Sequence, residues 1–284
     1  MRLAKWHGLG NDYLLVERSA LGAPLTPDQV RLLCDYHLGV GSDGILEVQS
    51  VDGPSAELTI WNPDGSTAEL SGNGTRIAAR WLARRSGASA VEIRVGRRTV
   101  SAEMLDGFRV RMDIGAVTVG SPETLTVEDE AVEFTPVSVG NPHAVIRREP
   151  DRTELLRLGP LLERHSRFPQ RTNVQLVAVD GPRALRVGVW ERGAGETLSS
   201  GTSSVAAAAA AVARGWCESP VTVTLAGGTL EVELRDGRAT LTGEAQEICT
   251  LSFRRSSTWA RSAPVERSSH FRCGVVRLHL ARSA

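Results

Sequence analysis

Short apolar runs, several of them alternating with polar residues, fill the early part of each half of the chain and predict β-strands. In each half the runs precede a glycine-rich loop and one segment with helical spacing. The runs in the first half are "LAKWHG", "YLLVE" and "AELTIWN", at residues 3–8, 13–17 and 56–62. Those in the second half are "PVSVG", "HAVIR" and "RVGVW", at residues 136–140, 143–147 and 186–190.

One helix is predicted in each half. In "TRIAARWLARRS" (75–86), Ile77 stacks with Trp81, and Gly87 is a natural C-terminal stop. Arginines line the other side at four-residue spacing: Arg76, Arg80 and Arg84. The second segment, "SVAAAAAAVARG" (204–215), is almost all alanine, which predicts a thin helix buried by close neighbours on every side.

Landmarks in the two halves recur in the same order at a nearly constant distance. Gly10-Asn11 and Gly140-Asn141 are 130 residues apart, and "WNPDGSTAELSG" and "WERGAGETLSSG" are 129 apart. Asp-Gly pairs, which are typical of hairpin turns, end at Gly107 and Gly237, again 130 apart. The chain is therefore interpreted as two copies of one module.

The repeat and the element order predict an α/β (α+β) fold with two pseudo-symmetric domains. Each is expected to be a bent, mostly antiparallel sheet or open barrel around one central helix. The predicted boundaries are 1–117 for the first module and 118–253 for the second, followed by a basic tail, 254–284, that is expected to be poorly ordered.

Composition narrows the function classes. Hydrophobic residues make up 41% and charged residues 23% of the 284, as in an ordinary globular protein. The N-terminus shows no signal peptide and no membrane span, so a cytoplasmic location without a membrane partner is expected. Net charge is zero, but the tail holds seven arginines and one glutamate, which leaves the body acidic. An acidic body argues against a nucleic-acid partner.

Lysine and cysteine usage argue against a bound cofactor or metal. Lys5 is the only lysine, and it lies beside a turn at the extreme N-terminus, so a pyridoxal phosphate enzyme is not expected. The four cysteines have neither metal-like nor redox-like spacing. We expect no cofactor and no metal site.

Two small loops, "SGNG" at 71–74 and "SSGT" at 199–202, stand at the N-termini of the predicted helices. Free N–H groups and the helix dipole make such positions suitable for a carboxylate or phosphate, although each loop alone is also typical of a tight turn. Related by a two-fold repeat, the loops would place Ser71 and Ser200 on either side of a bound anion. That arrangement suits two-base inversion of an amino-acid α-carbon.

Other polar residues gather at the same landmarks. Asparagines end or interrupt apolar runs, "GNPH" supplies His143, and "WER" supplies an adjacent Glu191 and Arg192. Arginine can bind a carboxylate with two hydrogen bonds and glutamate can accept from an ammonium group, while turn residues and a surface ion pair are the alternatives. The asparagines are Asn11, Asn62, Asn141 and Asn173.

At these residues the chain resembles the diaminopimelate epimerase family, whose fold is shared with proline racemase. The matching stretches are "KWHGLGNDYLLVE", "GSDGILEV", "WNPDGSTAELSGNGTRIAARWL", "VSVGNPHAV", "RTNVQLV" and "ERGAGETLSSGTSS". The resemblance implies two domains that close over a small-molecule amino acid, LL- or meso-2,6-diaminopimelate, without cofactor or metal. It places the reaction in lysine and peptidoglycan biosynthesis. The oligomeric state stays open, with a homodimer as one expectation.

The resemblance also implies roles for residues. Gly72-Asn73 and Gly201-Thr202 would hold the α-carboxylate of the reacting centre, which Asn11 and His143 would support. The distal ammonium group would lie against Glu191 and Asn62. The distal carboxylate would be held by four residues: Arg192, Asn62, Asn141 and Asn173.

The chain departs from the family at the two bases, because Ser71 and Ser200 stand where the family has cysteines. A serine alkoxide is far more basic than a thiolate, so serine needs an adjacent general base. His143 is the histidine of the site that could serve. The alternatives to an epimerase are an isomerase or lyase acting on another amino acid, and a catalytically silent protein that binds a ligand.

Overall fold

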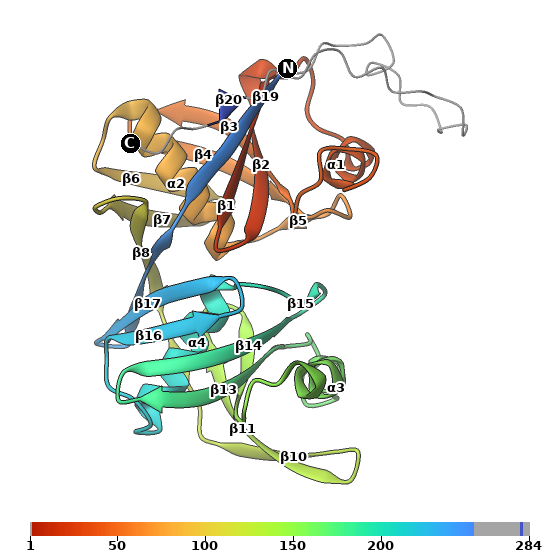
Figure 1. Cartoon of the computed structure of the whole chain (residues 1–284), viewed down its shortest axis with the longest axis vertical. Coiled ribbons are helices and arrows are strands. Elements are labelled where there is room, and N and C mark those ends of the chain that lie inside the picture. The colour runs from red at the N-terminus through yellow and green to blue at the C-terminus, as the bar shows by residue number, and fades with distance from the viewer. Residues whose placement is uncertain (1, 253–278, 281–284) are drawn as a thin grey trace.

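The computed structural model describes residues 2–252 and 279–280. Figure 1 shows two lobes, one above the other, joined where strands β8 (Arg109–Ala116) and β18 (Arg238–Glu244) pair. The predicted tail, 254–284, lies outside the described residues apart from β20 (His279–Leu280), which pairs antiparallel with β19.

The first lobe is built from strands and helices of the first copy. Its elements are β1 (Arg2–Gly8), β2 (Asn11–Glu17), η1 (Arg18–Ala20), α1 (Pro27–Cys34), β3 (Ile45–Asp52), β4 (Ser55–Trp61), β5 (Thr67–Ala68), α2 (Gly72–Ser86), β6 (Ala90–Val95), β7 (Arg98–Met104) and β8 (Arg109–Ala116).

The second lobe repeats this order after two additional strands and without the 3₁₀ helix. Its elements are β9 (Thr118–Val119), β10 (Glu123–Val127), β11 (Glu130–Ser138), β12 (Pro142–Arg147), α3 (Arg152–Glu163), β13 (Asn173–Gly181), β14 (Ala184–Glu191), β15 (Gly195–Glu196), α4 (Gly201–Ala213), β16 (Val221–Leu225), β17 (Gly228–Arg235) and β18 (Arg238–Glu244). The chain then continues as β19 (Gln246–Ser252).

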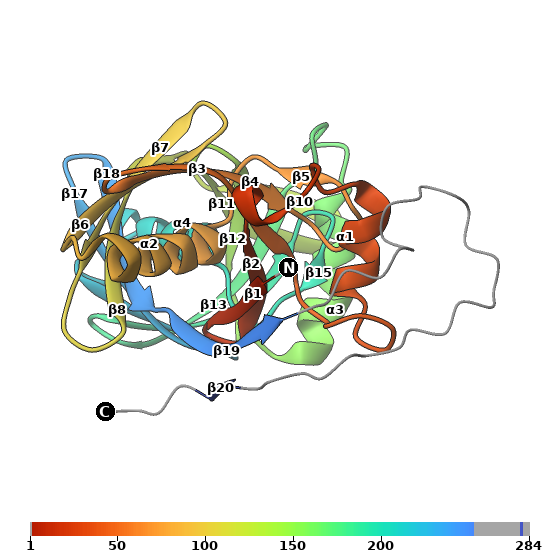
Figure 2. The same ribbon diagram turned by 90° about the horizontal axis from the view of Figure 1, so that it is seen from above.

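Strand pairing has the same pattern in both copies. The pairs β2–β3 and β4–β6 are parallel, as are β12–β13 and β14–β16, and the other ladders are antiparallel. Each of the four connections between parallel strands contains a helix, the usual form of such a crossover. The predicted fold class, a mostly antiparallel sheet around one central helix in each copy, is confirmed (Figure 2).

Each lobe is completed by a strand that arrives from the other side of the junction. β8 pairs with β18, while β9, which follows β8 directly, pairs with β11. In the same way β19 follows β18 and pairs with β1. Strand β19, which follows the second copy, thus pairs with β1 at the start of the first copy, and β9, which follows the first copy, pairs with β11 of the second. Each lobe therefore contains a strand that continues directly from the other lobe. The module boundaries at 117 and 253 stay a prediction.

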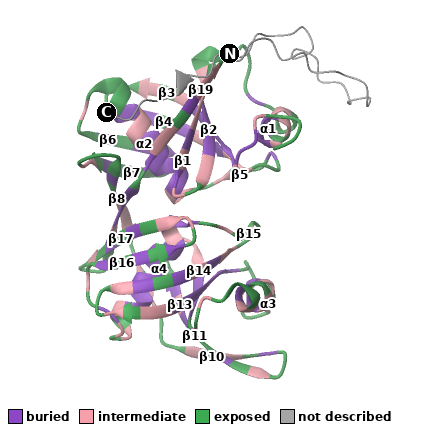
Figure 3. Cartoon of the chain, in the orientation of Figure 1, coloured by how far each residue is buried: buried purple, intermediate pink, exposed green. Residues whose placement is uncertain are grey.

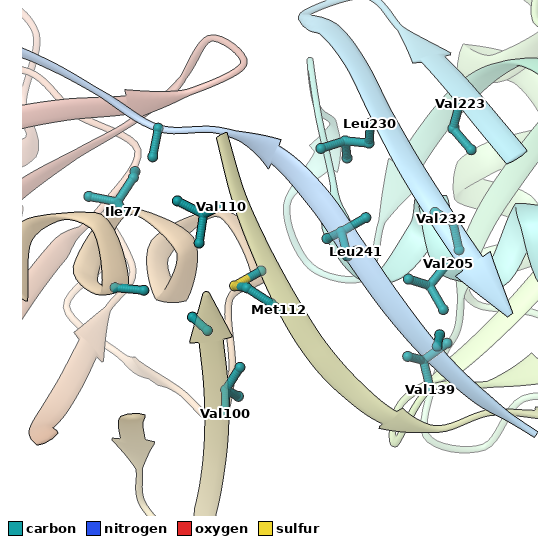
Figure 4. Packing of buried hydrophobic residues seen from close by; sticks show 14 of the residues in the cluster. Ile77, Val100, Val110, Met112, Val139, Val205, Val223, Leu230, Val232 and Leu241 are labelled. Carbon is teal, nitrogen blue, oxygen red and sulfur yellow. The ribbon is translucent and has the colours of Figure 1, made fainter. Parts of the chain in front are cut away.

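The central helices form the cores of the lobes. Residues 206–211 of α4 are at most 4% exposed, which confirms the expected thin, buried alanine helix. Purple segments, which mark buried residues, occur in both central helices and in many of the strands (Figure 3). The main apolar cluster continues from Ile77 and Met112 in the first lobe to Val205 and Leu241 in the second, across the β8–β18 junction (Figure 4).

Two outer helices did not emerge from the sequence patterns. Helix α1 begins with a capping box at Thr26 and covers one small apolar cluster, and α3 covers another. Pro160 lies inside α3 and interrupts the helical signal there. These helices occupy equivalent places along the chain, because each connects the two strands of a parallel pair.

The ends of the predicted elements are mostly where the residue types place them. Helix α2 stops at Gly87, whose φ of 73° is left-handed, and Asp236-Gly237 forms a two-residue hairpin between β17 and β18. Gly107 also has positive φ, but the first hairpin is longer, with β7 ending at Met104 and β8 starting at Arg109.

Arg76 differs from the other arginines of α2, because it is fully buried. Its Nε donates to Glu244 O at 3.0 Å, and its Nη2 donates to Asn73 Oδ1 at 2.9 Å. The connection from β18 to β19 covers this face of the helix, which local periodicity alone could not indicate.

Candidate active site

The N-termini of the two central helices meet at a pair of glycines. A Cβ on Gly72 would lie 3.1 Å from Gly201 Cα, and a Cβ on Gly201 would lie 3.3 Å from Gly72 Cα. Because the first N–H groups of a helix have no acceptor within it, the two ends bring free donors and two positive dipole ends together. One carboxylate can therefore be bound by both helices.

Ser71 and Ser200 are the N-cap residues of α2 and α4 and flank this contact. Both have extended backbones, but their side chains point to different partners. Ser71 Oγ accepts from Gly74 N at 3.0 Å and lies 2.9 Å from Tyr13 Oη. Ser200 makes no capping bond, and it lies near the Glu191 carboxyl group, whose pKa it lowers. The two hydroxyls are therefore not equivalent.

Glu191 ends β14 and is partly buried. Burial raises the pKa of its carboxyl group, and hydrogen bonds from Thr197 and Ser200 partly oppose that rise. Thr197 Oγ1 donates to Glu191 Oε1 at 2.8 Å. A carboxylate with a raised pKa beside a serine hydroxyl is suited to accept a proton through that serine.

Asn73 joins the two loops to each other. Its Nδ2 donates to the carbonyl and to the hydroxyl oxygen of Ser199, both at 3.0 Å, and to Asn11 Oδ1 at 3.1 Å. Asn11 Nδ2 in turn donates to Asp43 Oδ2 at 2.8 Å. With its side chain used in this way, Asn73 can offer a ligand its backbone N–H, alongside that of Gly72.

His143 lies on β12, is buried and is hydrogen-bonded through both ring nitrogens. Nδ1 lies 3.1 Å from Gln175 Nε2, and Nε2 lies 3.0 Å from Asn141 Oδ1. Because an amide nitrogen only donates, Nδ1 accepts and Nε2 carries the hydrogen. Burial lowers the pKa of His143 to about 3. The ring therefore holds Asn141 in place, and it is not the base that the serines require.

The residues expected to bind the distal end of a substrate do not all contact one another. Asn173 is buried, donates to Pro142 O at 2.9 Å and accepts from Arg192 N at 3.0 Å, so it sets the backbone of the Arg192 turn. The exposed Arg192 side chain donates to Gln170 O at 3.1 Å. Asn62 hydrogen-bonds within its own turn, to Ser66 Oγ at 2.9 Å.

The structure thus brings together Ser71, Gly72, Asn73, Gly201 and Asn11 at one centre. Ser200 precedes Gly201 at the same centre, and Asn141 is hydrogen-bonded to His143. Thr202 is the second residue of α4, next to Gly201.

Several residues of the site were missed by the sequence interpretation. Tyr13 contacts Ser71, Asp43 holds Asn11, and Gln175 links His143 to Ser203 Oγ at 3.0 Å. The repeat carried a signal for two of them, because Tyr13 lies 130 positions before His143, and Asp43 lies 130 before Asn173. Gln175 lies inside an apolar strand and had no such signal.

The described ranges, 2–252 and 279–280, contain neither a candidate metal site nor a helix that could span a membrane. No group of three or more histidine, cysteine, aspartate or glutamate side chains there could hold a metal ion. No helix there is long and apolar enough to cross a membrane.

Solved structures with this architecture include a racemase, an epimerase, an isomerase and phenazine biosynthesis proteins. A probable proline racemase from Agrobacterium radiobacter superposes with a TM-score of 0.67 at 16% identity, covering 90% of this chain and 93% of that one. A hydroxyproline epimerase from Agrobacterium vitis gives 0.65 at 17% identity, covering 88% and 90%. At these identities the likeness establishes the fold, which is that of the proline racemase class.

Comparison of the sequence with known proteins identifies the family of the chain. The profile of diaminopimelate epimerase matches residues 3–120 and 135–248. The diaminopimelate epimerase of Synechococcus elongatus is 38% identical over 269 residues, covering 87% of this chain and 96% of the relative. That of Desulfitobacterium hafniense is 38% identical over 273 residues with the same coverage. The chain belongs to the diaminopimelate epimerase family.

Proposed function

We propose that this enzyme interconverts LL- and meso-2,6-diaminopimelate by moving the α-proton between two faces of one carbon, with no cofactor. The contact between Gly72 and Gly201 supports this proposal above all, because it brings together the two helix N-termini at which Ser71 and Ser200 are the N-cap residues. Family membership supports the substrate and the reaction.

In the proposed mechanism the α-carboxylate binds to the backbone N–H groups of Gly72, Asn73, Gly201 and Thr202. Removal of the α-proton sends charge into this carboxylate, so donors fixed around it stabilise the carbanion more than the substrate. Both helix dipoles act in the same direction.

Ser200 is the residue that removes the proton, because it lies near the Glu191 carboxyl group and influences its pKa. The α-proton passes to Ser200 Oγ as the serine proton passes to Glu191. Ser71 lies on the opposite face of the α-carbon in this mechanism and returns a proton to that carbon. Arg192, together with Asn141, Asn173 and Asn62, would hold the distal carboxylate, and Glu191 with Asn62 would lie near the distal ammonium group.

Deuterium exchange tests the proposal. The protein is incubated with LL- or meso-diaminopimelate in deuterated water, and α-deuteration and isomer composition are followed with time. Exchange with inversion is expected. Exchange without inversion, or with loss of water or ammonia, would identify an isomerase or lyase for another amino acid. Binding without exchange would identify a silent protein. The homodimer and the cytoplasmic location stay predictions.

A further inference from the structure

Tyr13 is built into the site at a position shaped for its ring. It lies on β2 and is 7% exposed. A Cβ on Gly44 would lie 2.7 Å from Tyr13 Cε1 and 2.5 Å from Trp61 O, so the ring occupies the space that a side chain at 44 would need. The phenol is thereby held with Oη 2.9 Å from Ser71 Oγ.

The hydrogen bonds around Ser71 define the direction in which a proton can travel. Gly74 N–H already donates to Ser71 Oγ. Burial raises the pKa of Tyr13, so the phenol keeps its hydrogen and can donate to the same oxygen. Because Ser71 Oγ would then accept two hydrogen bonds, its own hydroxyl hydrogen stays available for a third partner, such as a carbanion.

Ser200 is arranged in the opposite sense. The carboxylate of Glu191, near Ser200, can only accept, so in the proposed mechanism Ser200 gives its hydrogen to Glu191 and keeps its lone pairs free. One serine is therefore prepared to give a proton and the other to take one.

We propose that Tyr13 is the positioning residue and proton source behind Ser71. This inference rests on the proposed epimerase function. The α-carbon lone pair takes the Ser71 hydroxyl proton, forming the C–H bond while the O–H bond breaks. Ser71 Oγ takes the phenolic proton as that O–H bond breaks. The resulting phenolate is reprotonated by water, and Glu191 returns its proton to water.

Tyr13 on the Ser71 side and Glu191 on the Ser200 side are electrostatically coupled. The negative charge of Glu191 is one of the causes that raise the pKa of Tyr13. Once Glu191 has accepted the proton, this contribution disappears, and the phenol can lose its proton more easily. The net charge of the site is unchanged, since the charge that Glu191 loses reappears on Tyr13.

Replacement Tyr13→Phe removes only the hydroxyl and keeps the ring against Gly44. We expect kcat for inversion to fall by about 100-fold, as for loss of one general acid, with KM changed less than about twofold. Exchange of the α-proton from the Ser200 face should persist, so exchange without inversion rises. Equal losses of inversion and exchange, or unchanged inversion, would overturn the assignment.

The matched control is Tyr36→Phe, which removes a phenol that hydrogen-bonds to Asp12 and Asp43. It should keep the ratio of inversion to exchange. A similar shift of the ratio in this variant would show that loss of any nearby phenol suffices, and would count against Tyr13.

A second readout does not need activity on diaminopimelate. In Ser71→Cys, a hydrogen bond from Tyr13 would stabilise the thiolate, so the pH profile of alkylation should move to higher pH when Tyr13→Phe is added. Buried Cys34, Cys217 and Cys249 are common to both proteins. Identical profiles would refute the role of Tyr13. A shift without epimerisation by the parent would refute only the proposed function.

Discussion

Gly72 and Gly201 lie back to back, so close that a methyl group on either would press against the backbone of the other. In the proposed mechanism this contact makes one anion site out of two helix ends that are 129 residues apart in the chain. It also sets the separation of the two serines that precede the glycines. The chemistry of the site therefore depends on a contact in which no side chain takes part.

Substitution Gly72→Ala should damage catalysis more than folding. The added Cβ, 3.1 Å from Gly201 Cα, must push the helix ends apart, and a displacement near 1 Å costs about 100-fold in rate. Steady-state kinetics would measure the loss. Gly181→Ala is the control, because its nearest neighbour would be Ala184 Cβ at 3.9 Å. Full activity in Gly72→Ala would show that the helices need not touch.

Replacing both serines by cysteine should make the enzyme faster. Each pKa unit is worth about 1.4 kcal/mol, and a thiol at a helix N-terminus ionises far more easily than a serine hydroxyl, so we expect a gain above about tenfold. The Ser71→Cys, Ser200→Cys double variant should also become sensitive to iodoacetamide, whereas the parent should resist it. A double variant no faster than the parent would contradict the two-base assignment.

His143 should make the fold less stable in acid. The unfolded chain takes up a proton near pH 6.5, while the folded chain holds His143 neutral down to about 3. Protons therefore favour unfolding in this window, and stability falls by up to about 1.4 kcal/mol per pH unit as the pH drops. Denaturant unfolding between pH 4 and 7 would measure the slope.

In His143→Gln this part of the slope should vanish, whereas His37→Gln, at an exposed histidine, should keep it. If both variants had the slope of the parent, the buried ring would not be the cause.

Arg76 should matter for stability far beyond a surface arginine. In Arg76→Met, Asn73 Oδ1 and Glu244 O would each lose a donor, and leaving buried acceptors unpaired costs about 1–3 kcal/mol each. Arg85→Met, which breaks an exposed ion pair with Glu17, should cost at most about 1 kcal/mol. Unfolding free energies compare the two, and equal values would contradict a structural role for the buried guanidinium.

Much of the architecture could be predicted because it is local. Apolar periodicity located both central helices and six strands, and Gly87 and Asp236-Gly237 marked an end and a turn through backbone preferences of single residues. The repeat then implied that both copies share one fold, and it placed a serine before each helix. The outer helix α3 escaped, since Pro160 weakens its local signal.

The partners of the site residues were decided only by the tertiary structure. Tyr13 and Ser71 are 58 positions apart, and Arg76 and Glu244 are 168 apart, so no local pattern links them. The sequence by itself determined that two serines stand at two equivalent helix ends. Folding then placed a phenol beside one and a carboxylate beside the other, because the equivalent positions of the two copies carry different residues.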